Sequence, residues 1–452
     1  MTEAKLRMSE IVAFAAPGLA TTLLVSPIFS VLPSIYALNT KATLTEIGLI
    51  FVVARIIDAI TDPIIGVASD WTKSRWGPRL PWIVAGTVIA VPASYFLFLP
   101  PPDAGALYFF LASNACLLAW TMITIPQAAW GAELSSNYDD RSRIFAISNF
   151  VARIGGFGFF LIPPLLAPLT GTTEINLSTM AALVVILAVA LPATVTWAAL
   201  KAPVRPSLSG GAEHASIMAA IRSLFGNKPL RHFIWVTVFA GVGTGMTTGL
   251  FLLLIQDYFK LGPYFFLIAL IPAVAGTVTI PFWVFVARVA GKHIAWGWTS
   301  IVGTLIGFPL LFLTPGPDAL VPVLVVVTLA GIMQGAGVML PSAILADIAD
   351  YETLKRGTHA QGNYFSVLFL LSKVTTAVGS GAGFWIADLL GYVPNVASGA
   401  SVLLLIPAAI IPGILTLVAS VLIFFTPITR RRHAIIAKRL AQRRERSLRP
   451  KA

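Results

Sequence analysis

Long apolar segments separated by short polar connections make up most of the chain. Twelve of these segments have about 20 residues or more, which is enough for an α-helix to cross a bilayer core of ~30 Å. The expected helices are 10–38, 45–69, 81–100, 106–132, 144–168, 179–200, 231–256, 265–289, 294–314, 320–346, 361–388 and 401–426. The pattern therefore predicts an all-α membrane protein with twelve transmembrane helices.

The connections alternate in charge. Lys and Arg gather at the N-terminus, in every second connection and in the tail, whereas the opposite loops hold only Lys41 and Lys260. Positively charged loops stay on the cytoplasmic side, so both termini are predicted to be cytoplasmic, in a multi-pass protein of the inner cell membrane. The net charge of +12 then follows from topology and does not indicate nucleic acid. We expect the basic tail to lie on anionic headgroups, with a docking role as the alternative.

A polar stretch divides six predicted helices from six, and the two halves are weakly alike. Pro63 in the second helix matches Pro281 in the eighth, and Pro126 in the fourth matches Pro341 in the tenth. Two pseudo-symmetric six-helix bundles around a central cavity are the plan of major facilitator transporters. The predicted parts are an N-terminal bundle (1–200), a central cytoplasmic loop (201–230), a C-terminal bundle (231–426) and a basic tail (427–452).

Composition agrees with this class and argues against several others. The chain is 57% hydrophobic and 11% charged, whereas soluble domains have about 25% charged residues. The single cysteine, Cys116, excludes an intramolecular disulfide and a cysteine-based metal site. The sequence has no GxSxG, HExxH or phosphate-binding loop, so we expect neither an enzyme nor a resident cofactor.

A few ionisable residues fall inside the predicted spans: Arg55, Asp58 and Asp62 in the second, Arg153 in the fifth and Lys373 in the eleventh. Each costs roughly 3 kcal/mol at mid-bilayer on insertion scales, so each should face a cavity or a partner. Asp58 and Asp62 are four residues apart and share one helix face with Arg55.

This group predicts a cation site. One arginine cannot neutralise two carboxylates, so the face has net negative charge and favours Na⁺ or a proton. Thr61 adds a hydroxyl, and Pro63 lacks the N–H that would bind the carbonyl of Ala59. The alternative is an Arg55–Asp58 pair with a purely structural role.

Four further residues carry weaker signals. Thr121 and Thr124 lie beside Trp120 in the fourth span, where they either face the pathway or bond back to their own helix. Lys373 either pairs with an aspartate of the second span or acts as a substrate ligand or gate. Arg153 is expected in the cytoplasmic half of the pathway.

Three stretches resemble the glycoside–pentoside–hexuronide:cation symporters, the melibiose permease family. They are "VARIIDAITDPIIGVASDWTKSRWGPRLPW", "IPQAAWGAELSSNYDDRSRI" and "ADIADYETLKRGTHAQGNYFSVLFLLSK". The resemblance extends to the vertebrate lysophosphatidylcholine symporter, a distant branch of the same superfamily. It implies the major facilitator fold and symport driven by a cation.

The resemblance also implies which residues bind. The family's sodium site corresponds to Asp58, Asp62, Thr61 and Thr121, although sodium-using members commonly have Asn at the position of Thr61. Its sugar-binding aspartates of helices 1 and 4 and its helix 5 arginine correspond to Thr22, Thr124 and Asn149. Arg153 lies one turn beyond Asn149 and is a candidate substitute. The remaining polar and aromatic groups, Lys373 and Trp120 among them, suit an anionic or amphiphilic substrate at least as well as a neutral disaccharide.

Charged loop residues are the candidate gate. Asp70, Arg75 and Arg79 follow the second span, and their expected partners are Glu133, Arg141, Asp347 and Asp350. We expect these contacts to hold the outward-open state, with simple surface charge as the alternative.

The combined expectation is a monomeric symporter in the lipid bilayer, coupled to Na⁺ or H⁺. It would carry a sugar or a sugar-derived solute, with an anionic group as one option. The alternative substrate is a lysophospholipid-type amphiphile.

Overall fold

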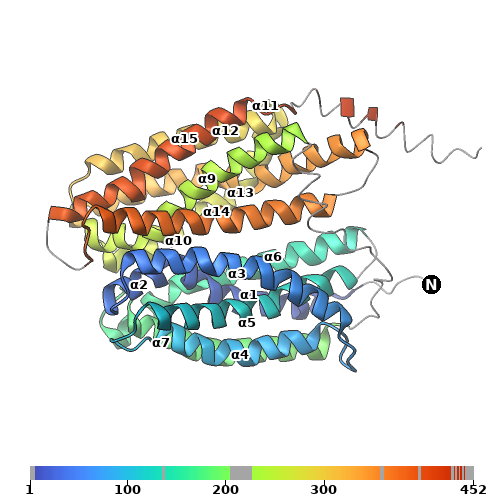
Figure 1. Cartoon of the computed structure of the whole chain (residues 1–452), viewed down its shortest axis with the longest axis horizontal. Coiled ribbons are helices and arrows are strands. Elements are labelled where there is room, and N and C mark those ends of the chain that lie inside the picture. The colour runs from blue at the N-terminus through green and yellow to red at the C-terminus, as the bar shows by residue number, and fades with distance from the viewer. Residues whose placement is uncertain are drawn as a thin grey trace, which may run out of the picture. The chain divides into compact units, whose positions relative to one another are not determined.

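The computed structural model describes residues 6–134, 138–203, 227–356, 361–394 and 399–428, and positions 432, 435, 436, 438, 439 and 442. Every regular element in these ranges is a helix, which confirms the all-α prediction. The first half forms α1 (Met8–Ser30), α2 (Leu32–Asn39), α3 (Leu44–Trp71), α4 (Leu80–Phe98), α5 (Ala106–Glu133), α6 (Tyr138–Thr170) and α7 (Leu177–Lys201) (Figure 1).

The second half repeats this succession of long helices. It forms α9 (Lys228–Leu253), α10 (Phe265–Val278), α11 (Ile280–Ala290), α12 (Lys292–Gly307), α13 (Leu320–Arg356), α14 (Gln361–Leu389) and α15 (Ile411–Phe424). Short π-helical turns follow α9 at Leu254–Tyr258 and precede α15 at Ile406–Ile410. Each of the twelve predicted segments contains at least one of these helices.

Not every helix is equally apolar. Within the described residues, nine helices are long and apolar enough to cross a membrane, or ten if the bent pair containing α10 and α11 is one span. The two further predicted spans coincide with α3 and α14. Helix α3 carries Arg55, Asp58 and Asp62, and α14 carries Lys373 among small and hydroxyl residues. The three charged residues of α3 are what set that helix apart from ordinary spans.

Two predicted spans are interrupted. The segment expected at 10–38 breaks at Val31 between α1 and α2, and the segment expected at 265–289 bends by 47° between α10 and α11. In both cases the following helix has a proline in its first turn, Pro33 or Pro281. Proline lacks a backbone N–H and suits the first turn of a helix, so each of these two prolines favours the start of a new helix at the break.

Helix α3, which carries most of the candidate site, has a well-defined start. The Thr43 hydroxyl accepts a hydrogen bond from the Glu46 N–H at 3.2 Å, and the Glu46 carboxylate accepts one from the Thr43 N–H at 2.8 Å. This reciprocal cap fixes the first turn. The helix then runs through Pro63 to Trp71.

The chain divides into two compact units. The first contains Met1–Ala212, Thr248–Leu270 and Gly381–Leu404, and the second contains Glu213–Thr247, Ile271–Ser380 and Leu405–Ala452. The boundary therefore passes through α9, α10 and α14 as well as the stretch 201–230. One end of each of these three helices belongs with the N-terminal bundle.

In the first unit, α1 packs on α6 and α7, α4 lies beside α5 and α7, and α3 packs on α5 (Figure 1). The α1–α6 contact is a close approach of backbones. A Cβ on Gly155 would lie 2.2 Å from the carbonyl oxygen of Leu19, so only glycine fits. The packing of α3 on α5 is what brings the candidate cation residues together.

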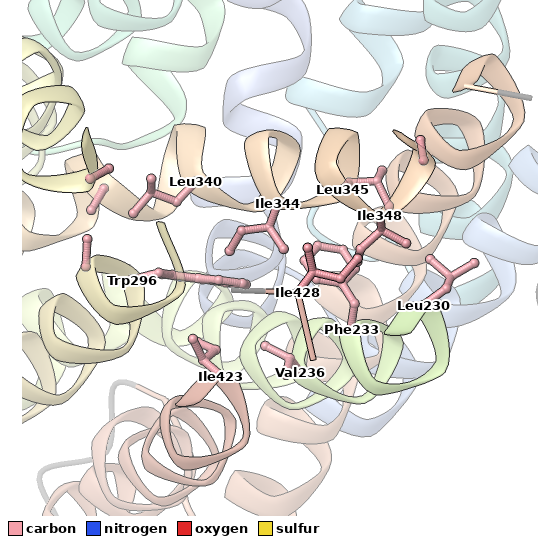
Figure 2. Packing of buried hydrophobic residues seen from close by; sticks show 14 of the residues in the cluster. Leu230, Phe233, Val236, Trp296, Leu340, Ile344, Leu345, Ile348, Ile423 and Ile428 are labelled. Atoms are coloured by element: carbon pink, nitrogen blue, oxygen red, sulfur yellow. The ribbon is translucent and has the colours of Figure 1, made fainter. Parts of the chain in front are cut away.

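The second unit has an apolar core between α9, α12, α13 and α15. Phe233 and Val236 of α9 face Trp296 of α12, with Leu340 and Ile344 of α13 beside them (Figure 2). The Phe233 and Trp296 rings are 6.2 Å apart between centroids.

The first unit's glycine contact recurs in the second, in the corresponding helices. A Cβ on Gly379 of α14 would lie 2.1 Å from the carbonyl oxygen of Val242 of α9. The internal repeat inferred from the prolines thus extends to helix packing.

Candidate functional site

Helix α3 buries an ion pair in its middle. Arg55 is 3% exposed and Asp58 is 4% exposed, and Nη1 of Arg55 lies 2.7 Å from Oδ2 of Asp58. The three-residue spacing places both side chains on one face of the helix. Taking two charges out of water is costly unless they are paired, so this contact offsets part of the cost of burying both groups.

The second carboxylate has a partner on another helix. Thr121 of α5 donates a hydrogen bond to Oδ1 of Asp62 at 3.1 Å, and Thr121 itself is 1% exposed. This contact joins two of the residues that the family resemblance implies for the cation site. Thr61 is partly buried beside it.

Three of the four predicted cation residues therefore take part in two contacts, Arg55–Asp58 on α3 and Asp62–Thr121 between α3 and α5. Thr61 is next to Asp62 in sequence. Two carboxylates, one guanidinium and a threonine hydroxyl give this cluster a net charge of −1. Hard cations such as Na⁺ prefer oxygen ligands, and a carboxylate can alternatively take up a proton. The cluster has the oxygen donors and the charge that either cation requires.

An aromatic ring covers the arginine. The guanidinium carbon of Arg55 lies 4.5 Å from the ring centroid of Phe29 of α1, within the range of a cation–π contact. Phe29 in turn lies 6.5 Å from Trp120 and 6.4 Å from Phe51 between ring centroids. Sequence reasoning selected Trp120 but missed Phe29, because a phenylalanine in an apolar span carries no distinguishing signal.

The positions that match the family's sugar ligands are tied to their own helices. The polar groups of Thr22, Thr124 and Asn149 each donate to the carbonyl four residues earlier, at 2.7, 2.9 and 2.9 Å. For Thr124 this is the back-bonding that the sequence left open. A donor already used in this way is less available to a sugar hydroxyl.

Two further predicted substrate ligands are basic. Arg153 lies partly buried on α6 in the first unit, and Lys373 lies partly buried on α14 in the second unit. Each makes interactions of its own. Their roles as substrate ligands stay predictions.

Arg79 is the centre of a charge cluster at the end of α3. Its guanidinium pairs with Asp70 and with Glu133 of α5, at 2.7 Å from Nη2 to Oε1 of Glu133. Nη1 also donates to the Ser69 hydroxyl at 2.7 Å. Burial lowers the pKa of Arg79, but the hydrogen bonds from Glu133 and Asp70 outweigh it, so the pKa is raised overall. Four polar groups thus fasten the α3–α4 connection to the end of α5.

The second unit has the corresponding contact. Lys292, at the start of α12, lies 2.6 Å from Asp347 of α13 between Nζ and Oδ1, and it donates to the Ala343 carbonyl at 3.1 Å. Sequence reasoning selected Asp347 but not Lys292. The ion pairs of Arg79 thus lie within the first unit, and the Lys292–Asp347 pair lies within the second.

The other predicted gate residues are less defined. Arg75 is exposed, with its guanidinium 5.1 Å from the Trp76 ring, and Asp350 is partly buried with an interaction of its own. The side chain of Arg141 lies outside the described side chains. A gating role for these residues stays a prediction.

At the opposite end of α3, the first unit joins segments from distant parts of the chain. Thr45 donates a hydrogen bond to Asp388 of α14 at 2.5 Å, and Thr173 donates to the Pro263 carbonyl at 2.6 Å. A Cβ on Gly48 would lie only 2.7 Å from the Gly381 carbonyl oxygen, so α3 and α14 touch backbone to backbone. Sequence reasoning missed these contacts, because no local pattern reports a pairing over 343 residues.

A buried acid lies at the same end. Asp257, in the π-helical turn after α9, is 6% exposed. It accepts a hydrogen bond from the Tyr392 hydroxyl at 2.5 Å and pairs with Lys260 at 3.1 Å. Burial, and then the bond to Asp257, raises the pKa of Tyr392. The tyrosine is therefore a neutral donor that holds the end of α9 to the segment after α14.

Comparison with known proteins identifies a family and several relatives of this chain. A family described as "MFS/sugar transport protein" matches residues 13–430. The "uncharacterized symporter YnaJ" of Bacillus subtilis is 24% identical, with 97% of this chain and 96% of the relative covered. The "glucuronide carrier protein homolog" of Escherichia coli is 23% identical, with 88% of each chain covered.

A vertebrate relative and a solved structure extend the comparison. The "sodium-dependent lysophosphatidylcholine symporter 1-B" of Danio rerio is 24% identical, with 76% of this chain and 72% of the relative covered. The crystal structure of the nucleoside transporter NupG superposes with a TM-score of 0.69 at 14% identity, covering 93% of this chain and 99% of that one. This likeness shows the fold alone.

Relatives named as symporters match nearly the whole chain, and both the family and the structural neighbour are transporters and not enzymes. The chain is a multi-pass membrane protein that belongs to the MFS/sugar transport protein family.

Proposed function

We propose that the protein is a secondary symporter in which a cation bound at Asp58 and Asp62 drives uptake of a sugar or sugar-derived solute. The observation that carries the proposal is that two carboxylates share one face of α3 and that one of them accepts a hydrogen bond from the Thr121 hydroxyl of α5. Na⁺ is the first candidate cation, because hydroxyl and carboxylate oxygens are available together. A proton is the alternative.

Charge supports coupling between cation and solute. The cluster of Arg55, Asp58 and Asp62 sums to −1 without a cation and to zero with one. A buried net charge disfavours closure around a solute, whereas a neutral cluster does not. Binding of the cation therefore favours solute binding, and the effect must be reciprocal.

A lysophospholipid-type amphiphile is the second candidate substrate. The side-chain donors of Thr22, Thr124 and Asn149 already bind carbonyls of their own helices. They are therefore less available to a sugar, which favours an amphiphile. A sugar needs several such groups for its hydroxyls, whereas an amphiphile needs one polar anchor and apolar walls. The relative from Danio rerio is named as a sodium-dependent symporter of lysophosphatidylcholine, an amphiphile of this kind.

Uptake into proteoliposomes tests the coupling. Inward gradients of Na⁺ and of H⁺, applied separately, should show which cation accelerates uptake of labelled glycosides, glucuronides or lysolipids. Asp62→Asn should abolish this acceleration. Asp103→Asn, at an exposed loop position, makes the same chemical change away from the cluster and should keep it. Equal gradient stimulation in both variants would refute the proposed cation site.

A further inference from the structure

The Arg55 guanidinium uses only part of its hydrogen-bonding capacity. Nη1 contacts Asp58 at 2.7 Å, whereas Nε and Nη2 are buried and have no hydrogen-bond acceptor among the described residues. The side chain is 4% exposed. Buried donors of a charged group are normally satisfied, because an unmet one carries the full desolvation penalty.

The two unmet donors lie on the same edge of the guanidinium. Nε–H and the adjacent Nη2–H point in parallel, and this edge is the fork that binds carboxylate or phosphate oxygens in a bidentate manner. The face of the group is covered by Phe29 at 4.5 Å, and Nη1 is directed at Asp58. The edge that suits an oxyanion is therefore the one that the protein leaves without an acceptor.

The surroundings fit a ligand with an apolar or ring-shaped part next to its charge. Phe29 lies within 6.5 Å of the Trp120 ring and within 6.4 Å of the Phe51 ring between centroids. Aromatic faces stack against sugar rings and also line apolar chains. The arginine edge would fix the charged end of such a ligand, and the aromatic side chains would contact the remainder.

From these observations we infer that the Nε/Nη2 edge of Arg55 binds an oxyanion of the transported substrate, a carboxylate or a phosphate. The inference rests on the proposed symport, and it narrows the substrate to solutes that carry such a group.

The inference also gives each charge a role. Without a cation, Asp58 and Asp62 outnumber Arg55 and repel an anion, whereas a bound cation removes the excess negative charge. Cation and anionic substrate then bind with mutual support.

Matched pairs of probes test this on the full-length protein in lipid nanodiscs. One pair is p-nitrophenyl β-D-glucuronide and p-nitrophenyl β-D-glucoside, which differ at the carboxylate. The other is lysophosphatidylcholine and the monoacylglycerol of the same chain, which lacks the phosphate and its choline. In saturating NaCl, the oxyanion member of one pair should bind about tenfold tighter or more than its neutral partner. The pair that discriminates identifies a carboxylate or a phosphate as the recognised group.

Variants separate the fork from charge alone. Arg55→Lys keeps the charge but lacks the paired donors, so the affinity ratio within the discriminating pair should fall to about threefold or less. Arg231→Lys makes the same change at an exposed position and should keep the ratio. Ratios near one for both pairs in the wild type would overturn the inference, and so would an unchanged ratio in Arg55→Lys.

A measurement on the wild type alone covers the case in which Arg55→Lys does not fold. Replacing NaCl with a sodium-free salt and working at high pH removes both candidate cations. The affinity ratio within the discriminating probe pair should then fall several-fold. An affinity ratio that stays the same after the cations are removed would contradict the charge argument. Failure of the inference is distinguishable from failure of symport, because gradient-driven uptake of the neutral glucoside would support symport without oxyanion recognition.

Discussion

Arg79 offers the sharpest test of how the first unit is held together. Its side chain is 6% exposed, and that of its partner Glu133 is 12% exposed. Arg79→Gln would leave this carboxylate buried without its counter-charge. Breaking a buried ion pair by removing one partner costs about 3–5 kcal/mol. Asp70 is 32% exposed and regains hydration, so we expect a loss near the lower limit, about 3 kcal/mol of unfolding free energy.

The corresponding contact of the second unit provides the control. Lys292 is 37% exposed in its side chain and pairs with Asp347 at 2.6 Å. Exposed pairs contribute about 1 kcal/mol or less, because water competes for both groups. Lys292→Gln should therefore destabilise the protein far less than Arg79→Gln, although the two residues occupy matching places in the repeat.

The unfolding free energy of both variants can be measured in bicelles by steric trapping. A double-mutant cycle with Glu133→Gln should give a coupling free energy above about 1.5 kcal/mol, since either single change already breaks the pair. The pKa of Arg79 is raised, so on the alkaline side its contribution is lost only above the ordinary arginine range. The gap between wild type and Arg79→Gln should thus not narrow between about pH 7 and 9. Equal losses in Arg79→Gln and Lys292→Gln, or strict additivity in the cycle, would refute this reasoning.

Three further predictions concern the site and the packing. Thr121→Val, which removes the hydroxyl that contacts the second carboxylate of α3, should weaken cation binding about tenfold by isothermal titration; Thr124→Val, which loses only a bond to its own helix, should change it less than twofold. Gly155→Ala should lower the yield of folded protein in fluorescence-detected size exclusion, because the new Cβ meets a backbone carbonyl of α1, whereas Gly105→Ala, which has nothing within 4 Å, should not. Asp388→Ala removes the acceptor of the hydrogen bond from α3, so a cysteine introduced at its end of α14 should react several-fold faster with an impermeant thiol reagent; an unchanged rate would show that this hydrogen bond does not hold the two helix ends together. The native Cys116 is fully buried and gives little background.

Much of the fold follows from local pattern, and its departures have local causes. The segment predicted at 45–69 is observed as Leu44–Trp71, because apolar length and the Thr43–Glu46 cap are both written in adjacent residues. The break at Val31 and the bend before Ile280 were missed. Apolar periodicity does not report where two helical segments change direction, although Pro33 and Pro281 were the available signals.

In the candidate site too, contacts within one helix were predictable from the sequence, whereas contacts between helices were not. The Arg55–Asp58 pair depends only on spacing along one helix, so the sequence predicts it. The contact between Asp62 and Thr121 depends on α3 packing against α5, and only the family resemblance selected it in advance. The ring of Phe29 over Arg55 joins helices that share no motif. Which side chains meet across helices is decided by packing, and a single sequence does not contain that information in readable form.

The contact of Gly48 with Gly381 has a consequence for energy conservation. A constriction made of side chains can loosen whenever one of them changes rotamer, on a timescale of nanoseconds. Here two backbones touch, so a path for water or ions at this point opens only when α3 and α14 move as whole helices, in microseconds or longer. In the symport proposed above, brief thermal fluctuations would then not let the coupling cation pass this contact without the solute.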